Sequence, residues 1–274
     1  MTKTDAFSGV VQCARVESWI PQNGDGAGLR DGRKGLEMDG QLTKKLIVEF
    51  IGTFALLFMG IGAIALTGGT DIVAIALAHG LAIGLLIMAA GHISGGFFNP
   101  AVTLGMVAAR RMDVPTAGLY IVAQLLGALA GTLAIFMTFP NEMRDTVRDG
   151  VPAVGAGFSS GNALVAEIVT TFFLVFVIFG VAVDQRSAKG INGLVIGLTI
   201  SIGILATGAV SGAALNPARW FGPAVAGGHW DDFWIWIVGP IVGGILGALV
   251  YHDVLMTGEG LEPDENSASA RPPR

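Results

Sequence analysis

The sequence predicts an all-α membrane protein with six transmembrane helices and two half-length helices arranged in an inverted repeat. Three observations support this fold class. Of the 274 residues, 52% are hydrophobic and only 14% are charged, which is unlike the composition of soluble domains. Six apolar stretches are long enough to cross a bilayer, and one sequence pattern occurs twice. The 41 glycines are typical of helices that pack closely in lipid.

The apolar stretches define the predicted spans. A bilayer core of about 30 Å requires roughly 20 apolar residues in a helix. Six stretches meet this length, at about 44–67, 71–91, 115–138, 162–183, 191–209 and 233–255. Two shorter stretches, 99–109 and 216–227, would each rise about 15 Å as helices, half of the bilayer. We expect a channel domain over 43–257, and disordered tails at 1–42 and 258–274 because those ends are polar.

Basic residues near the span ends predict the orientation. In a six-span topology they fall on one side together with both tails: Lys44, Lys45, Arg110, Arg111, Arg186 and Lys189. Since Lys and Arg concentrate in cytoplasmic loops, both termini are predicted to be cytoplasmic, in a multi-pass protein of the cell membrane. The lone Cys13 excludes an intrachain disulfide and a Cys-cluster metal site. No basic patch indicates nucleic-acid binding.

An internal repeat is visible in the first and fourth spans. "EFIGTFALLF" begins at Glu49 and "EIVTTFFLVF" begins at Glu167. An Asn-Pro-Ala triplet follows each Glu at nearly the same spacing, namely Asn99-Pro100-Ala101 and Asn216-Pro217-Ala218. Each unit, 43–138 and 162–255, holds three spans, so the second copy must be inverted in the membrane. Inverted repeats place a shared site near the midplane.

The two Asn-Pro pairs each predict the start of a half-length helix, because Asn is a favoured N-cap and Pro is favoured at the first helical position. Inversion brings the two positively charged helix N-termini together in the middle of the membrane. The preceding segments, "HISGGFF" and "AVSGAAL", would present backbone carbonyls to a water-filled cavity. The pore would then have a line of carbonyl acceptors, the Asn amides as donors and a positive centre made by the two helix N-termini. This arrangement is typical of a pore that passes small neutral solutes and excludes cations and protons.

The segments "GHISGGFFNPAVTLG" and "SGAALNPARWFGPAV" resemble the two signature loops of the aquaporin, or major intrinsic protein, family. The resemblance covers about residues 44–255. It implies a homotetramer in the lipid bilayer with one pore in each subunit, a passive channel for water and small neutral solutes, and no enzymatic activity, cofactor or metal.

The resemblance also implies a selectivity filter made by His79, Ile204, Ala213 and Arg219. An ionisable residue inside a span is a functional candidate by default. For His79 the alternative is a neutral, hydrogen-bonded packing residue. This set is similar to the filters of plant tonoplast aquaporins and lacks the Phe and His of the strict water type. We therefore predict a wider ring that admits ammonia, hydrogen peroxide or urea beside water.

Two other functions stay open from the sequence. A glycerol and urea facilitator of the same family is one, although glycerol channels carry Asp after the second NPAR, where this chain has Trp220. An ion-coupled secondary transporter is the other, since inverted repeats and broken helices also occur in that class. Coupled, saturable flux would distinguish it from a channel.

Four further residues complete the predicted site. The resemblance implies that Glu49 and Glu167 brace the two loops; a proton relay would require neighbouring acids, which the spans lack. His92 is a candidate for the cytoplasmic mouth or a pH-sensitive gate, with simple loop structure as the alternative. Phe97 stands where many relatives have His, which makes the cytoplasmic approach less polar. Some relatives have a mercurial-sensitive Cys at position 213, so Ala213 predicts an insensitive pore.

Overall fold

The computed structural model describes residues 40–187 and 190–256, which form helices and contain no strand. The disordered tails predicted at 1–42 and 258–274 lie outside these ranges, apart from residues 40–42. Those three residues are helical, so the prediction was wrong there. Polar residues can extend a helix beyond the apolar stretch, because the backbone hydrogen bonds continue whether or not the side chains contact lipid.

Six helices of the described residues are long and apolar enough to cross a membrane, as predicted. Their α-helical parts are α1 (Gly40–Thr67), α2 (Ile72–Ser94), α4 (Val114–Thr138), α6 (Ser160–Ile178), α7 (Asn192–Ser211) and α9 (Ile235–Leu249). A short π-helix continues α6 over Phe179–Val183 and α9 over Val250–Leu255. The half-length helices are α3 (Pro100–Ala108) and α8 (Pro217–Gly227). The sequence did not predict α5 (Asn141–Thr146) or the 3₁₀ turn Arg148–Gly150 that follows it.

Local capping explains where several helices begin. Asp71 accepts a hydrogen bond from the Ala74 backbone N–H, and Asp113 accepts one from Thr116. Ser159 starts α6 with a capping box. These side chains satisfy N–H groups that have no partner inside the helix, and so fix the ends of the spans near the membrane surface.

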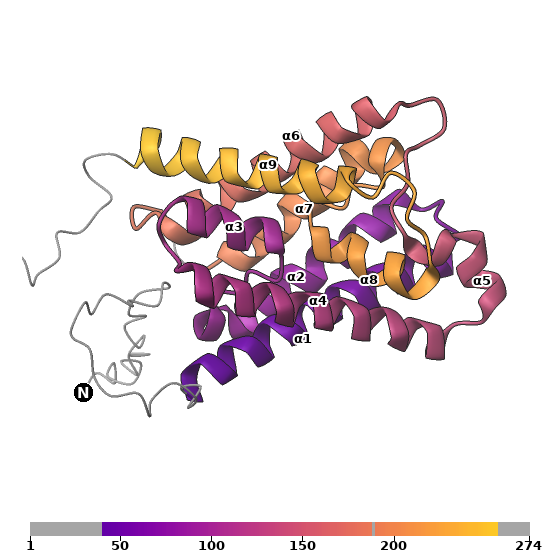
Figure 1. Cartoon of the computed structure of the whole chain (residues 1–274), viewed down its shortest axis with the longest axis horizontal. Coiled ribbons are helices and arrows are strands. Elements are labelled where there is room, and N and C mark those ends of the chain that lie inside the picture. Colours follow the sequence, from indigo (N-terminus) through magenta and orange to yellow (C-terminus); the bar gives the residue numbers. More distant parts are fainter. Residues whose placement is uncertain (1–39, 188–189, 257–274) are drawn as a thin grey trace, which may run out of the picture.

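The two repeats interlock around the half-length helices. In Figure 1, α3 and α8 enter from opposite ends of the bundle and reach its middle. Each packs on the last span of the other repeat, α3 against α9 and α8 against α4. Within the repeats α1 packs against α4 and α6 against α9, while α2 and α7 join the two units. The starts of both half-length helices are therefore held between the two repeats.

Glycine pairs allow the spans to approach closely. A Cβ atom at Gly127 of α4 would lie 3.0 Å from the carbonyl carbon of Phe50 in α1. A Cβ at Gly243 of α9 would lie 2.9 Å from that of Ile168 in α6, the equivalent contact of the second repeat. Both positions belong to a G-x-x-x-G pair, a spacing that lets two helices approach closely along one face.

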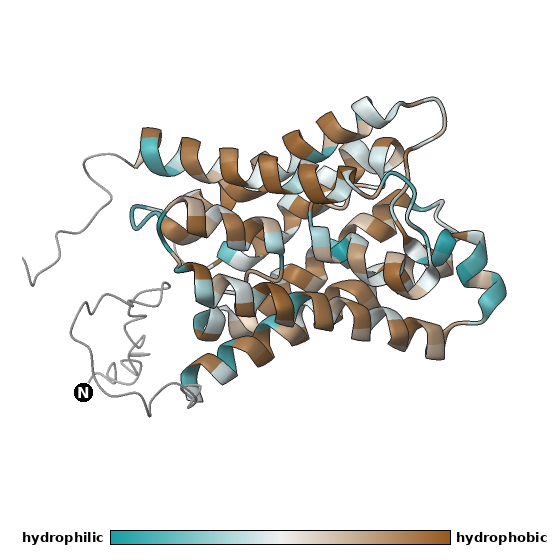
Figure 2. Ribbon diagram, viewed as in Figure 1, coloured by the Kyte–Doolittle hydropathy of each residue, from teal (hydrophilic) through white to brown (hydrophobic). Residues whose placement is uncertain are grey.

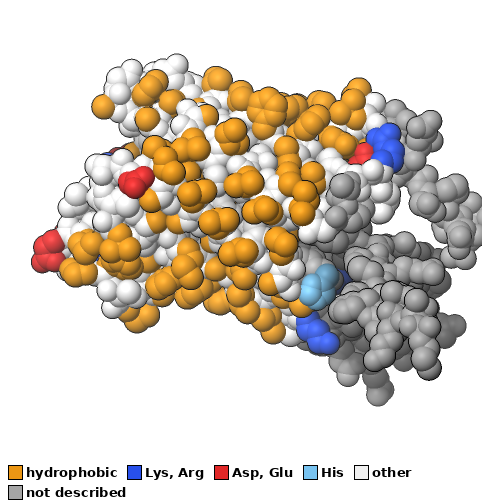
Figure 3. All heavy atoms as spheres, turned by 180° about the vertical axis from the view of Figure 1, so that it is seen from behind, with side chains coloured by type: hydrophobic (Ala, Val, Ile, Leu, Met, Phe, Trp, Pro, Cys, Tyr) orange, Lys and Arg blue, Asp and Glu red, His pale blue; other side chains and the backbone are white. Residues whose placement is uncertain are grey.

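The outer surface of the bundle is apolar along its length. Figure 2 shows hydrophobic residues over the spans and hydrophilic residues mostly at their ends, and Figure 3 shows the same belt on one face. Outward side chains such as Leu85, Val165 and Ile202 are more than half exposed. A belt of this kind fits contact with lipid rather than water.

Candidate functional site

The backbone ahead of α3 and α8 follows the same path in both repeats. Gly95 and Gly212 end the preceding helices with φ of 97° and 74°, a left-handed conformation that glycine adopts without a steric cost. Phe98 and Leu215, directly before the two Asn residues, also have positive φ, at 51° each. Left-handed backbone at non-glycine residues requires support from the surroundings.

In the first repeat that support comes from Glu49, which is fully buried. One carboxylate oxygen accepts hydrogen bonds from the Ser94 hydroxyl at 2.7 Å and the Phe97 N–H at 3.0 Å. The other accepts from the Phe98 N–H at 2.7 Å and from Gln124 at 2.8 Å. All four partners are donors, so the carboxylate holds the loop in place.

Glu167 makes the equivalent set in the second repeat. It is also fully buried and accepts from the Ser211 hydroxyl at 2.7 Å, the Ala214 N–H at 2.9 Å and the Leu215 N–H at 2.8 Å. Neither carboxylate lines the central cavity.

Two serines belong to this arrangement and were not predicted. The Ser94 carbonyl accepts from the Tyr120 hydroxyl at 2.8 Å, and the Ser211 carbonyl accepts from the Trp236 indole at 2.9 Å. A signal was present, because both serines stand five residues before an Asn-Pro-Ala triplet and precede a glycine.

The two Asn side chains join the half-length helices at the centre. Each side-chain oxygen caps its own helix by accepting the N–H two residues further on, at 2.8 and 2.9 Å. Each amide nitrogen crosses to the other repeat: Asn99 donates to the Leu215 carbonyl at 2.8 Å, and Asn216 donates to the Phe98 carbonyl at 2.9 Å. Pro100 and Pro217 occupy the first helical positions. An amide nitrogen carries two hydrogens, so one on each Asn is left for another acceptor.

A narrow cavity of about 30 Å³ runs beside these Asn residues, enough for a few water molecules. Its lining includes the four predicted filter residues and one of the two residues predicted for the cytoplasmic mouth: His79, Ile204, Ala213, Arg219 and Phe97. Much of the remaining wall is aliphatic, from Ile83, Ile87, Leu174, Ile178, Ile196 and Ile200. His92 lies apart from this cavity, in a groove beside Lys44 and Ile47.

Arg219 is 4% exposed and donates to the Gly150 carbonyl at 2.7 Å. Gly150 and the two residues before it have positive φ. The loop is held by a buried ion pair of 2.7 Å between Arg144 and Asp149, and the Arg144 guanidinium lies 3.9 Å from the centre of the Phe136 ring. Sequence reasoning missed Gly150, because a carbonyl from a distant loop leaves no local signal.

His79 is 2% exposed, and its two ring nitrogens have different surroundings. Nδ1 lies 2.9 Å from the Ile75 carbonyl, which can only accept, so Nδ1 carries a hydrogen. Nε2 is buried and makes no hydrogen bond within the described part of the chain. The ring thus lines the cavity while its Nδ1 hydrogen is bonded to backbone.

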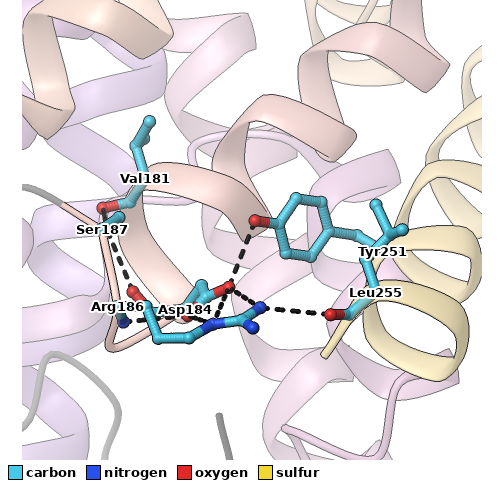
Figure 4. Close-up of polar contacts among 6 residues, drawn as sticks. All are labelled: Val181, Asp184, Arg186, Ser187, Tyr251 and Leu255. Atoms are coloured by element: carbon cyan, nitrogen blue, oxygen red, sulfur yellow. Dashed lines mark hydrogen bonds and ion pairs between the residues drawn. The ribbon is translucent and has the colours of Figure 1, made fainter. Parts of the chain in front are cut away.

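A polar network at the ends of α6 and α9 was also not predicted (Figure 4). Arg186 contacts Asp184 at 2.7 Å and donates to the Leu255 carbonyl at 3.1 Å, while the Tyr251 hydroxyl lies 3.2 Å from Asp184. The hydrogen bond from Arg186 lowers the pKa of Asp184 to about 2. The network connects the two π-helical ends where the spans leave the bundle.

Comparisons with known proteins agree with this architecture. The sequence profile described as "Major intrinsic protein" matches residues 38–251. The chain is 41% identical to Aquaporin TIP4-4 of Zea mays over 82% of this chain and 92% of that protein. It is 43% identical to Aquaporin AqpM of Methanothermobacter marburgensis, over 77% and 97% of the two chains.

A solved structure is similar as well. The aquaglyceroporin of Plasmodium falciparum superposes with a TM-score of 0.71 at 28% identity, covering 78% of this chain and 97% of that one. With the family profile spanning more than half of the sequence, the chain belongs to the major intrinsic protein family, a family of multi-pass membrane channels.

Proposed function

We propose that this protein is a passive pore for water that also admits ammonia, hydrogen peroxide or urea and excludes ions and protons. The observation that carries the proposal is the Asn pair. Asn99 and Asn216 come from opposite repeats, line one narrow cavity, and each keep an amide hydrogen for a passing acceptor. A water oxygen held by both amides would point its hydrogens away from the centre in both directions.

Exclusion of charge follows from the same geometry. Both half-length helices direct their N-termini, each with roughly half a positive charge, at the cavity. Arg219 adds a full positive charge to the lining. Cations and protons therefore meet an electrostatic barrier that neutral solutes do not.

The buried acids favour a channel over an ion-coupled transporter. An acid that couples flux to an ion or proton has to be reachable from the cavity. Glu49 and Glu167 lie outside the cavity, and their oxygens are engaged by loop donors.

The filter lining supports a range of small solutes. Ile204 and Ala213 present only apolar groups and His79 has its Nδ1 hydrogen bonded to backbone, which leaves Arg219 as the strong donor of the ring. A glycerol and urea facilitator is the second candidate, favoured by the similarity to the aquaglyceroporin structure. It ranks lower because the family's glycerol position holds Trp220, which is buried against Trp236 at a ring distance of 6.4 Å.

The remaining features are proposed from the family. We place the protein in the cell membrane as a homotetramer with a pore in each subunit and with both termini in the cytoplasm. The apolar outer faces of the spans suit contact with lipid and with neighbouring subunits. Native mass spectrometry of the detergent-solubilised protein would test the tetramer.

Stopped-flow measurements on proteoliposomes test the proposed function. We expect water permeability with a low activation energy, together with ammonia, peroxide or urea flux. His79→Phe and Ile204→His should narrow the ring and reduce solute flux more than water flux. Leu81→Phe is a matched control, because Leu81 is an exposed residue on the same helix as His79. Reflection of all three solutes by the wild-type protein would contradict the wider filter, and water flux equal to that of empty liposomes would contradict the channel.

A further inference from the structure

The position of the His79 ring depends on a glycine in the neighbouring helix. Gly60 of α1 is buried, and its Cα faces the edge of the imidazole of His79 in α2. A Cβ atom added at Gly60 would lie 2.5 Å from Cδ2 and 2.6 Å from Cε1 of His79, and closer still to Nε2. Real Cβ atoms essentially never approach other atoms so closely, so the ring occupies the space that a side chain at position 60 would take.

The ring also contacts the Ile75 carbonyl and borders the cavity. Nδ1 donates to Ile75, one turn earlier in the same helix. His79 lines the cavity, whereas Gly60 does not. The ring therefore lies between Gly60 and the pore, and an atom added at Gly60 would push the imidazole toward the pore.

We propose that Gly60 is a positioning residue that sets the width of the filter by receiving the His79 ring. The missing side chain forms a recess in α1 that keeps the imidazole out of the solute path. With the ring in the recess, the opening between His79, Ile204 and Arg219 is wider than it would be with the ring displaced toward the pore. This inference rests on the proposed pore function, and it assigns the width of that pore to a residue outside the lining.

The test is Gly60→Ala in proteoliposomes, read as the ratio of urea to water permeability. Alanine is a better helix former than glycine, so a loss of flux would not reflect a weaker helix. We expect the ratio to fall about fivefold, because a displaced ring obstructs a larger solute more than water. An equal change in both permeabilities, or no change in either, would overturn the proposal.

Two further variants separate the recess from general packing. Gly62→Ala is the control on the same helix, because the three atoms nearest to its Cβ would belong to Phe139 and Ile135, at ordinary contact distances of 3.5 Å or more. The urea-to-water ratio should not change in this variant. In Gly60→Ala/His79→Ala the added methyl group enters vacated space, so the double variant should match His79→Ala alone. If Gly60→Ala does not fold, the double variant should fold. A double variant that keeps the Gly60→Ala defect would refute the recess.

A measurement without transport distinguishes this inference from the pore function. Nitrogen NMR of histidine-labelled protein reports which imidazole nitrogen carries the hydrogen, and His79→Ala identifies the signal among the four histidines. We expect a neutral ring protonated at Nδ1 in the wild-type protein and an altered signal in Gly60→Ala. An unchanged His79 signal in Gly60→Ala would overturn the positioning role, whether or not the protein conducts water.

Discussion

Replacing either bracing carboxylate by its amide should destabilise the pore loops, by a size that follows from the hydrogen bonds. In Glu49 one oxygen accepts the Phe97 N–H and the other the Phe98 N–H. In Glu167 the oxygens accept the Ala214 and Leu215 N–H groups in the same way. A glutamine has one oxygen and one NH₂ group. Whichever way it is placed, one backbone N–H loses its acceptor and faces a donor.

The cost combines two terms. A hydrogen bond to a charged group contributes about 1.5–3 kcal/mol, and a buried donor without a partner costs about 1–3 kcal/mol. We therefore expect Glu49→Gln and Glu167→Gln each to lower the free energy of unfolding by about 3–5 kcal/mol. At about 2–4 °C per kcal/mol for a chain of this size, the melting temperature should fall by about 10 °C. The inverted repeat predicts similar losses for the two variants.

Thermal unfolding of the detergent-solubilised protein measures this loss, and stopped-flow water permeability measures its consequence for the pore. Glu142→Gln is the control, because Glu142 is exposed in α5 and should change stability by less than about 0.5 kcal/mol. Melting temperatures of Glu49→Gln and Glu167→Gln that equal the control would refute the reasoning. A large loss in only one of them would refute the equivalence of the two repeats.

Three other changes have definite outcomes. Asp149→Asn removes the buried ion pair beside Gly150. It should lower the free energy of unfolding by about 3 kcal/mol, measured by thermal melting. It should also raise the urea-to-water permeability ratio, measured in proteoliposomes. The pKa of Asp184 is lowered to about 2, so the ionised side chain stabilises the folded protein fully above about pH 4 and loses this effect as the pH falls through 2. Asp184→Asn should therefore lower the free energy of unfolding by about 1–2 kcal/mol, equally at pH 5 and pH 8. Mercuric chloride should not block the wild-type pore but should block Ala213→Cys; block that disappears in Cys13→Ala would contradict this.

The spans and the half-length helices could be predicted because the membrane fixes their signals. A bilayer requires long apolar stretches, and the Asn-Pro pairs at Asn99 and Asn216 mark helix starts within otherwise apolar sequence. The glycine contacts of α4 and α9 were predictable for a similar reason, since close helix packing requires small residues at fixed spacing.

Other parts of the site could not be predicted, because they depend on contacts between distant segments. The Gly150 carbonyl reaches Arg219 across 69 positions of sequence, from a loop whose left-handed residues include no motif. The recess at Gly60 required knowing which face of α1 meets His79. Periodicity gives the faces of one helix, whereas the partner of each face comes only from the packed bundle.

The inverted repeat also explains why one end of the pore discriminates among solutes. In each repeat, four residues at fixed offsets from the Asn of the triplet line the cavity. The residues at equal offsets are His79 and Ile196, Ile204 and Ile87, Ala213 and Gly96, and Arg219 and Val102. The fold thus builds two rings of equivalent geometry. One holds a histidine and an arginine, and the other is wholly apolar. Since the central Asn bonds are the same in both repeats, the symmetric centre cannot itself set a difference between the ends. Discrimination among solutes must then come from the two polar substitutions and from what positions them, Gly60 behind the histidine and Gly150 beside the arginine.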